Sequence, residues 1–141
     1  WESLAIVEYL AERHPQAGVW PAGRLDRARA RSVCAEMHAG FGPLRDHCPM
    51  AILRREPQDM LLAQVEADIR RIVAVWRDCR ARYGAGGPFL FGQFSIADAM
   101  YIPVATRFRT YVPDLGPYGD AIQYELLPFV EQLDEDLIEV L

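Results

Sequence analysis

The apolar positions of the chain recur at intervals of three and four residues over most of its length. The clearest run covers residues 58–83, where charged positions such as Arg70 and Arg71 fall outside the apolar series. This spacing places the apolar side chains on one face of an α-helix. The members of this apolar face are Leu62, Val65, Ile69, Ile72, Trp76, Cys79 and Tyr83.

Two features precede that helix at the start of the chain. The same period predicts a helix over residues 1–14, which Pro15 ends. The following segment, QAGVWPAG, is rich in glycine and proline and therefore predicts a turn-rich linker. Trp20 is the large apolar side chain of this linker, and we expect it to pack between helices.

A long helix is predicted from about Leu25 towards Cys48. Proline in a helix interior lacks the amide hydrogen and clashes with the preceding turn. We therefore expect this helix to bend over residues 40–43, which include Pro43 and two glycines. Its apolar face consists of Val33, Met37, Phe41, Leu44 and Cys48.

The stretch FLFGQFSIADAMYIPVATRFRTY predicts a helix from Ser95 to about Thr110, with Pro103 in its interior. In SIAD, Ser95 can accept a hydrogen bond from the amide of Asp98, and the Asp98 carboxylate can reach back to the Ser95 amide. This pattern is a capping box, which satisfies two amides that a helix start leaves free. We interpret it as structural rather than catalytic, and in a buried setting its loss costs about 1 to 2 kcal/mol or more.

These elements together predict the fold class. Two further helices are expected at about residues 118–126 and 128–140. No strand-like alternation is present, and FLFGQF is too short and too broken by glycine to predict a strand. The sequence therefore predicts an all-α fold, a bundle of about six helices.

Composition and charge then exclude several classes of protein. The chain has 141 residues, 51% of them hydrophobic, which suits one domain with a real core. The net charge is −5, and the arginines of RLDRARARS are not interleaved with aromatics, so we expect no nucleic-acid binding. No apolar run approaches the roughly 20 residues that span a bilayer. We expect a cytoplasmic protein that does not associate with membranes.

The cysteines give no sign of a disulfide framework or a metal site. They are Cys34, Cys48 and Cys79, an odd number at wide spacing with no pair two residues apart. We expect three buried or half-buried thiols in a reducing compartment.

With these segments in place, the chain resembles the bacterial type of glutathione S-transferase. The Ser-x-x-Asp box after FLFG and the stretch ADAMYIPVATRFRTY are similar to the core helix of that family's helical C-terminal domain. ESLAIVEYLAERHP is similar to the last helix of its thioredoxin-like N-terminal domain, and VWPAG with RARARSVCAEMHAGFGPLR is similar to the linker and the next helix. The resemblance implies a thioredoxin-domain helix over 1–15, an interdomain linker over 16–24 and the helical C-terminal domain over 25–141.

The resemblance also implies three glutathione-binding residues. Glu2 and Ser3 stand where the family holds the γ-glutamyl end, and a helix N-terminus with an acidic side chain suits a carboxylate and an ammonium. His38 stands where bacterial members place a histidine near the glutathione sulfur, and an imidazole can donate to a thiolate or a water. The alternatives are a plain helix cap for Glu2 and Ser3, and an interhelical or surface histidine for His38.

A second set of residues corresponds to the wall of the pocket for the electrophilic second substrate. These residues are Arg107, Phe108 and Tyr111, and their aromatic rings could stack on a hydrophobic electrophile. Packing within the domain explains them equally well.

No residue of this chain matches the family's catalytic Ser, Cys or Tyr, or its cis-proline, because both belong to the earlier part of the thioredoxin-like domain. The resemblance implies that a parent protein conjugates glutathione, as co-substrate and without a further cofactor, to a hydrophobic electrophile. It also implies a homodimer, and a chain that is inactive alone. The alternatives are a glutathione-dependent isomerase of the same family and a non-catalytic helical interaction module.

A surface prediction follows from the same resemblance. The face that the thioredoxin-like domain covers should be unusually apolar for an exposed surface. The residues expected on it are Leu4, Val7, Tyr9 and Leu10.

Overall fold

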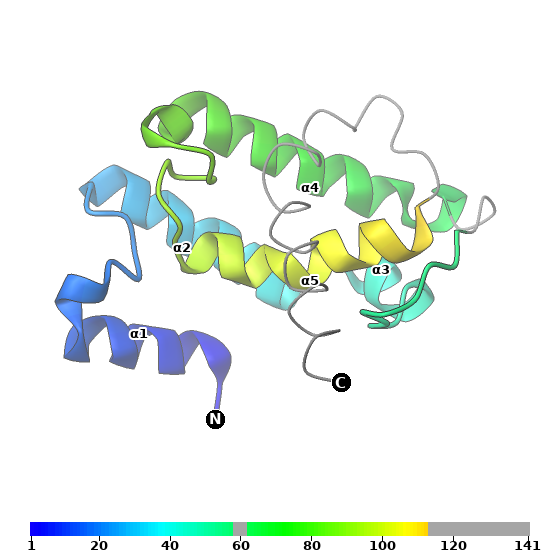
Figure 1. The fold of residues 1–141 in the computed structure, drawn as a ribbon, viewed down its shortest axis with the longest axis horizontal. Coiled ribbons are helices and arrows are strands. Elements are labelled where there is room, and N and C mark those ends of the chain that lie inside the picture. Colours follow the sequence, from blue (N-terminus) through cyan, green and yellow to red (C-terminus); the bar gives the residue numbers. More distant parts are fainter. Residues whose placement is uncertain (58–61, 113–141) are drawn as a thin grey trace. The chain divides into compact units, whose positions relative to one another are not determined.

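The computed structural model describes residues 1–57 and 62–112, and within these ranges it contains helices and no strand (Figure 1). The expected all-α fold is confirmed. The helices predicted at 118–126 and 128–140 lie outside the described residues. In chain order the elements are α1 (Ser3–Arg13), η1 (Pro15–Ala17), α2 (Arg24–Ala39), α3 (Gly42–His47), α4 (Leu62–Tyr83), η3 (Gly84–Gly86) and α5 (Ile96–Tyr111).

Two compact units make up the described chain. The first consists of Trp1–Gly40 and Cys79–Met100, and the second of residues 41–78 and 101–112. The boundary falls inside α4 and inside α5, so each of these helices contributes residues to both units.

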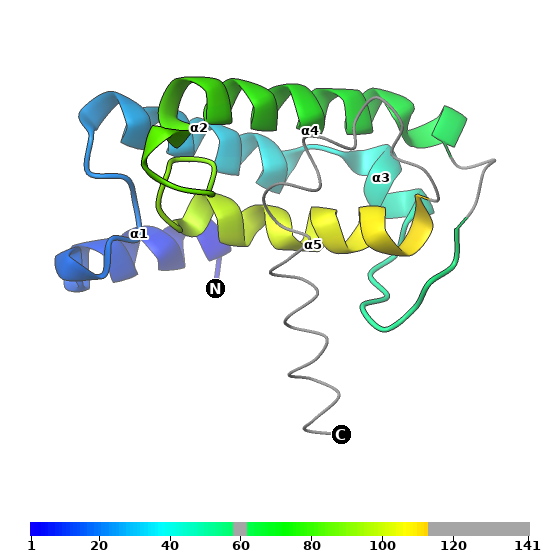
Figure 2. The same ribbon diagram turned by 45° about the horizontal axis from the view of Figure 1, so that its top comes forward.

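In the first unit, α1 runs beside α2 and is joined to it by η1 and the following linker (Figure 2). Trp20 in this linker is only 8% exposed, so its expected burial is confirmed. The linker is also tied to the start of α5, because the amide of Ile96 donates to the carbonyl of Val19 at 3.0 Å. The linker therefore connects the entrance of α5 to the α1–α2 pair.

The loop between α4 and α5 is held by one arginine. The Nη1 group of Arg80 donates to the carbonyls of Gly84, Gly87 and Phe89 at 3.2, 2.6 and 2.6 Å. The ring of Phe91 stacks on that of Tyr83, with centroids 5.3 Å apart. These contacts fix the backbone that leads into the buried start of α5.

The second unit is built around the apolar face of α4. The rings of Trp76 and Tyr101 form a T-shaped pair with centroids 5.6 Å apart, and Trp76 also packs against Phe108 at 6.0 Å. The predicted apolar face of α4 is confirmed at Val65, Ile69, Ile72, Trp76 and Cys79, all at most 1% exposed, while Tyr83 is half-buried.

Neither α4, the longest helix, nor any other described helix is long and apolar enough to cross a membrane.

The long helix predicted from Leu25 towards Cys48 is wrong, because the structure divides it. α2 ends at Ala39 and α3 begins at Gly42, and between them Phe41 takes a left-handed conformation with φ of 61°. Such a φ is uncommon for a residue with a side chain, and the burial of Phe41, which is 8% exposed, holds it in place. The chain therefore leaves the helical conformation at this point instead of bending within one helix, while each residue of the predicted apolar face, from Val33 to Cys48, is buried.

Pro103 does not interrupt α5, which continues as one helix to Tyr111. The flanking residues Val104 and Ala105 are 3% and 0% exposed. Packing around this part of the helix offsets the amide that proline lacks.

The expected apolar surface on α1 is confirmed only in part. Tyr9 and Leu10 are 60% and 43% exposed, and Ile6, which was not predicted, is 47% exposed. Val7 contradicts the prediction because it is 8% exposed and faces inward, while Leu4 is half-buried. The exposed apolar surface of α1 therefore consists of Ile6, Tyr9 and Leu10, and does not include Val7.

Candidate functional site

Glu2 caps the N-terminus of α1. Its backbone is extended, and its Oε2 accepts a hydrogen bond from the Leu4 amide at 3.1 Å. The carboxylate thereby satisfies one free amide and places negative charge at the positive end of the helix dipole. Glu2 thus caps α1 through Oε2, while its other carboxylate oxygen, Oε1, lies near different partners.

His38, in the last turn of α2, is one of those partners. Its Nε2 lies 3.1 Å from Glu2 Oε1, and its Nδ1 lies 3.5 Å from the hydroxyl oxygen of Ser3. That hydroxyl also donates to Glu2 Oε1 at 3.3 Å. The three residues predicted to bind glutathione therefore form one cluster, although His38 is distant from the other two in sequence.

This cluster is open to solvent and carries a carboxylate. The side chains of Glu2 and His38 are 46% and 43% exposed. Desolvation by itself would raise the pKa of Glu2, but the charge of His38 and hydrogen bonds from Ser3 and the Leu4 amide outweigh it, so the pKa lies below its ordinary value. An ionised carboxylate with one oxygen towards solvent can bind a primary ammonium by charge-assisted hydrogen bonds.

The residues predicted for the second-substrate pocket make contacts within the second unit. Arg107 is half-buried, and its Nε donates to the Cys48 carbonyl at 2.8 Å. The Tyr111 hydroxyl donates to the Pro49 carbonyl at 2.9 Å, and Phe108 has no exposed surface. These contacts support the packing interpretation, since they tie the segment after α3 to α5. The pocket-wall role stays a prediction, and Arg107 is the member with the most exposure.

The capping box of α5 is buried, and one of its two expected bonds is present: the Asp98 carboxylate accepts from the Ser95 amide, whereas the Asp98 amide donates to the Ser95 backbone carbonyl at 3.1 Å and not to the Ser95 hydroxyl. Asp98 is 0% exposed, and its Oδ2 accepts from the Ser95 amide at 2.8 Å and from the Ser95 hydroxyl at 3.0 Å. Its Oδ1 accepts a further bond from the Leu90 amide at 2.9 Å. Burial raises the pKa of Asp98 above its ordinary value, although these hydrogen bonds oppose that rise. The carboxylate is enclosed, so its role is to hold the loop to the start of α5.

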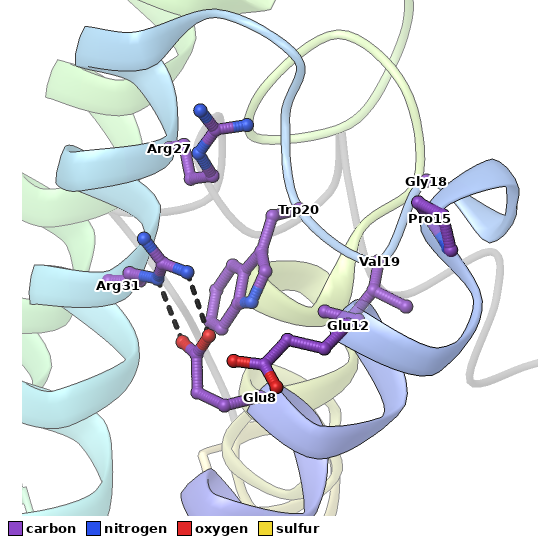
Figure 3. Close-up of a pocket in the computed structure, with 9 residues that line it drawn as sticks. Glu8, Glu12, Pro15, Gly18, Val19, Trp20, Arg27 and Arg31 are labelled. Carbon is purple, nitrogen blue, oxygen red and sulfur yellow. Dashed lines mark hydrogen bonds and ion pairs between the residues drawn. The ribbon is translucent and has the colours of Figure 1, made fainter.

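Sequence reasoning missed an ion pair between α1 and α2. Arg31 Nε donates to Glu8 Oε1 at 2.8 Å, and Arg31 Nη2 donates to Glu8 Oε2 at 2.7 Å. The Arg31 guanidinium carbon also lies 5.5 Å from the centroid of the Trp20 ring, beside a cavity of about 400 Å³ (Figure 3). The arginine cluster of RLDRARARS was the available signal, but no local rule identifies which arginine meets which acid.

The cysteines are buried, as expected. Burial raises the pKa of the Cys34 thiol to about 12, and the charges of Asp98 and Cys79 add to that rise. A thiol of this kind is protonated at neutral pH and is a poor nucleophile. Among the described residues no group of histidine, cysteine and acidic side chains is arranged to hold a metal ion.

Comparison with known proteins gives a family match over the later part of the chain. The family model described as "Glutathione S-transferase, C-terminal domain" matches residues 59–136, which is more than half of the sequence.

The similar curated proteins carry the name of one enzyme. A "Probable maleylacetoacetate isomerase" of Caenorhabditis elegans is 26% identical over 143 residues, which cover 99% of this chain and 60% of that protein. A "Probable maleylacetoacetate isomerase 1" of Drosophila melanogaster is 26% identical over 140 residues, covering 99% and 51%. A "Maleylacetoacetate isomerase" of Pseudomonas aeruginosa is 33% identical over 75 residues, covering 53% and 32%. The chain thus spans about half the length of the relatives that it matches end to end.

Proposed function

The chain belongs to the glutathione S-transferase family, and from this premise we propose that Glu2, Ser3 and His38 form the γ-glutamyl end of a glutathione site. The observation that carries the proposal is the cluster itself. Three residues singled out by family resemblance, from two different helices, lie within 3.5 Å of one another at a solvent-open helix start.

The chemistry of the γ-glutamyl group fits this cluster. Its α-ammonium would bind the ionised Glu2 carboxylate at Oε1, where His38 is the partner in the structure. Its α-carboxylate would bind the hydroxyl of Ser3 and the N-terminal end of α1, where the helix dipole favours negative charge. His38, released from Glu2, would then donate to the ligand.

Substitution of Glu2 tests the site directly. We expect Glu2→Gln to weaken glutathione binding about tenfold, because a charge-assisted hydrogen bond becomes a neutral one. Glu12→Gln is the matched control, since Glu12 is exposed on the same helix. Isothermal titration calorimetry with glutathione compares the variants. If both substitutions weaken glutathione binding equally, Glu2 has no specific role in the site.

We further propose that the reaction of the parent protein is glutathione-dependent isomerisation in preference to conjugation. Both reactions were expected from the family, and the names of the relatives from three organisms favour the isomerase. In either case the group that activates the thiol would come from a thioredoxin-like domain of the parent protein. Assay of the full-length protein with a maleyl substrate and with a chlorinated aromatic separates the two reactions.

The remaining rival is a helical interaction module without catalysis. It predicts no turnover of either substrate and no effect of glutathione on the protein. A parent enzyme of this family should form a homodimer, and light scattering after size-exclusion chromatography measures its mass. A glutathione-independent monomer would favour the interaction module.

A further inference from the structure

Helix α1 is attached to the rest of its unit with little apolar burial. Of its eleven residues, only Val7 is buried. The position of α1 along α2 must therefore depend largely on polar contacts. These contacts occur at two levels, one at Ser3 and His38 and the other at Glu8 and Arg31.

The second level is a bidentate ion pair between Glu8 and Arg31. Both carboxylate oxygens of Glu8 accept from two different nitrogens of Arg31, at 2.8 and 2.7 Å (Figure 3). A two-point contact of this kind restricts orientation as well as distance. The hydrogen bond from Arg31 also keeps the pKa of Glu8 below its ordinary value, so the pair stays charged.

Arg31 is in turn held by a buried side chain. Its guanidinium lies over the ring of Trp20, 5.5 Å from the centroid, and Trp20 is 8% exposed. A cation in this position is attracted to the face of the indole. The Glu8–Arg31 pair therefore connects α1 to a buried side chain of the unit.

The two levels are close enough to depend on each other. Glu8 follows Ser3 by five residues, and His38 follows Arg31 by seven, so at 1.5 Å per residue the levels are roughly 8 to 11 Å apart. The helices run antiparallel, because the early part of α1 meets the late part of α2. A shift of α1 by one turn, about 5.4 Å, would separate both pairs at once.

We propose that the Glu8–Arg31 pair is a positioning device for the candidate site: it holds α1 in the register that brings Glu2 and Ser3 to His38. Its importance for a ligand rests on the proposed function, whereas its effect on the cluster does not. Neither Glu8 nor Arg31 touches the ligand in this account, so both act only through the placement of α1.

The experiment compares Glu8→Gln and Arg31→Gln with two matched controls. The controls are Glu12→Gln on α1 and Arg24→Gln on α2, both at exposed positions. The first readout needs no ligand: NMR titration of the Glu2 side-chain carboxyl carbon. We expect the pKa of Glu2 to move up towards its ordinary value in both pair variants, because His38 no longer stays beside it, and to stay unchanged in the controls.

The second readout is the dissociation constant for glutathione. We expect it to rise about threefold to fivefold in each pair variant, the upper part of the range for an exposed ion pair. The double variant should bind glutathione as well as either single variant, because the same Glu8–Arg31 pair is lost in all three. Arg31→Lys should lie between, since lysine keeps the charge but cannot make the two-point contact.

The two readouts separate the outcomes. If the pKa of Glu2 and the affinity keep their wild-type values in the pair variants, the positioning role is overturned and the proposed function stands. If the pKa responds but the wild-type protein binds no glutathione, the proposed function fails and the register effect stands. Far-ultraviolet circular dichroism checks folding, and if Arg31→Gln does not fold, the comparison of Arg31→Lys with Arg24→Lys decides.

Discussion

Replacement of Asp98 by alanine should be among the most damaging single changes in the described part of the chain. The carboxylate is 0% exposed and accepts three hydrogen bonds, two from Ser95 and one from the Leu90 amide. Alanine leaves the Ser95 and Leu90 amides without this acceptor in a place that excludes water. Each buried amide without a partner costs about 1 to 3 kcal/mol.

The net effect is smaller than the sum of these costs. Asp98 is itself expensive to bury, as its raised pKa indicates, and removing the carboxyl recovers part of that cost. We therefore expect a loss of about 3 kcal/mol in the free energy of unfolding, a large share of the roughly 5 to 15 kcal/mol typical of a domain. Ser95→Ala removes only the hydroxyl contact and should cost about 1 kcal/mol.

Urea unfolding followed by circular dichroism at the helix band measures these values. Asp46→Ala, at an exposed position in α3, serves as the matched control and should change the free energy by less than about 0.5 kcal/mol. If Asp98→Ala unfolds within 1 kcal/mol of the wild type, the argument that this carboxylate secures the entrance of α5 is refuted.

Further predictions concern pH, thiol reactivity and one hydroxyl. Because burial raises the pKa of Asp98 above 3.8, the native state holds a proton that the unfolded state has released, so the free energy of unfolding should fall as pH rises from 3.8 through the raised pKa. Asp98→Asn should lack this slope in unfolding curves measured across that range. Cys34, with a pKa of about 12 and no exposed surface, should resist iodoacetamide at pH 8 in the native protein and react after unfolding. Mass spectrometry measures this reaction as the mass added to the peptide that contains Cys34. Tyr111→Phe removes the bond to the Pro49 carbonyl and should lower the unfolding free energy by about 1 kcal/mol in urea titration, whereas an unchanged value would show that water replaces the hydroxyl.

The features that could be predicted from sequence are those set by short-range spacing. The capping box joins Ser95 and Asp98 over three residues, so the bond from the Ser95 amide to the Asp98 carboxylate follows from helix geometry once the helix start is identified, although the Ser95 hydroxyl donates to that carboxylate instead of accepting from the Asp98 amide. The buried face of α4 follows in the same way from the period of its apolar residues. Both predictions needed no knowledge of how distant segments meet.

The features that escaped prediction depend on such meetings or on rare backbone conformations. The Leu90 amide reaches Asp98 from the loop between α4 and α5, where Arg80 binds the carbonyls of Gly87 and Phe89. Glu8 and Arg31 pair across two helices, and any of several arginines nearby fits the pattern equally well. The left-handed conformation of Phe41 was not expected, because glycine and not phenylalanine usually takes it.

The residues predicted for the candidate site also differ in outcome, because their contacts depend on how distant segments of the chain pack. Family resemblance singled out Glu2, Ser3 and His38, and the structure brings them within hydrogen-bonding distance of one another. Arg107 and Tyr111, singled out in the same way, instead make bonds to backbone carbonyls of their own unit. Resemblance gives positions, whereas exposure and partners decide which positions are available to a ligand.

The central claim is that Glu2, Ser3 and His38 receive the γ-glutamyl end of glutathione. The most direct measurement is an NMR titration of this chain with glutathione, following the Ser3 amide and the His38 ring. Because the chain would supply only part of the site, we expect half-saturation in the millimolar range, about −4 kcal/mol of binding free energy at 1 mM. Both signals should shift together, and γ-glutamylcysteine should reproduce the shifts, whereas cysteinylglycine, which lacks the γ-glutamyl group, should not. Equal shifts with cysteinylglycine, or saturation that Glu2→Gln leaves unchanged, would contradict the account.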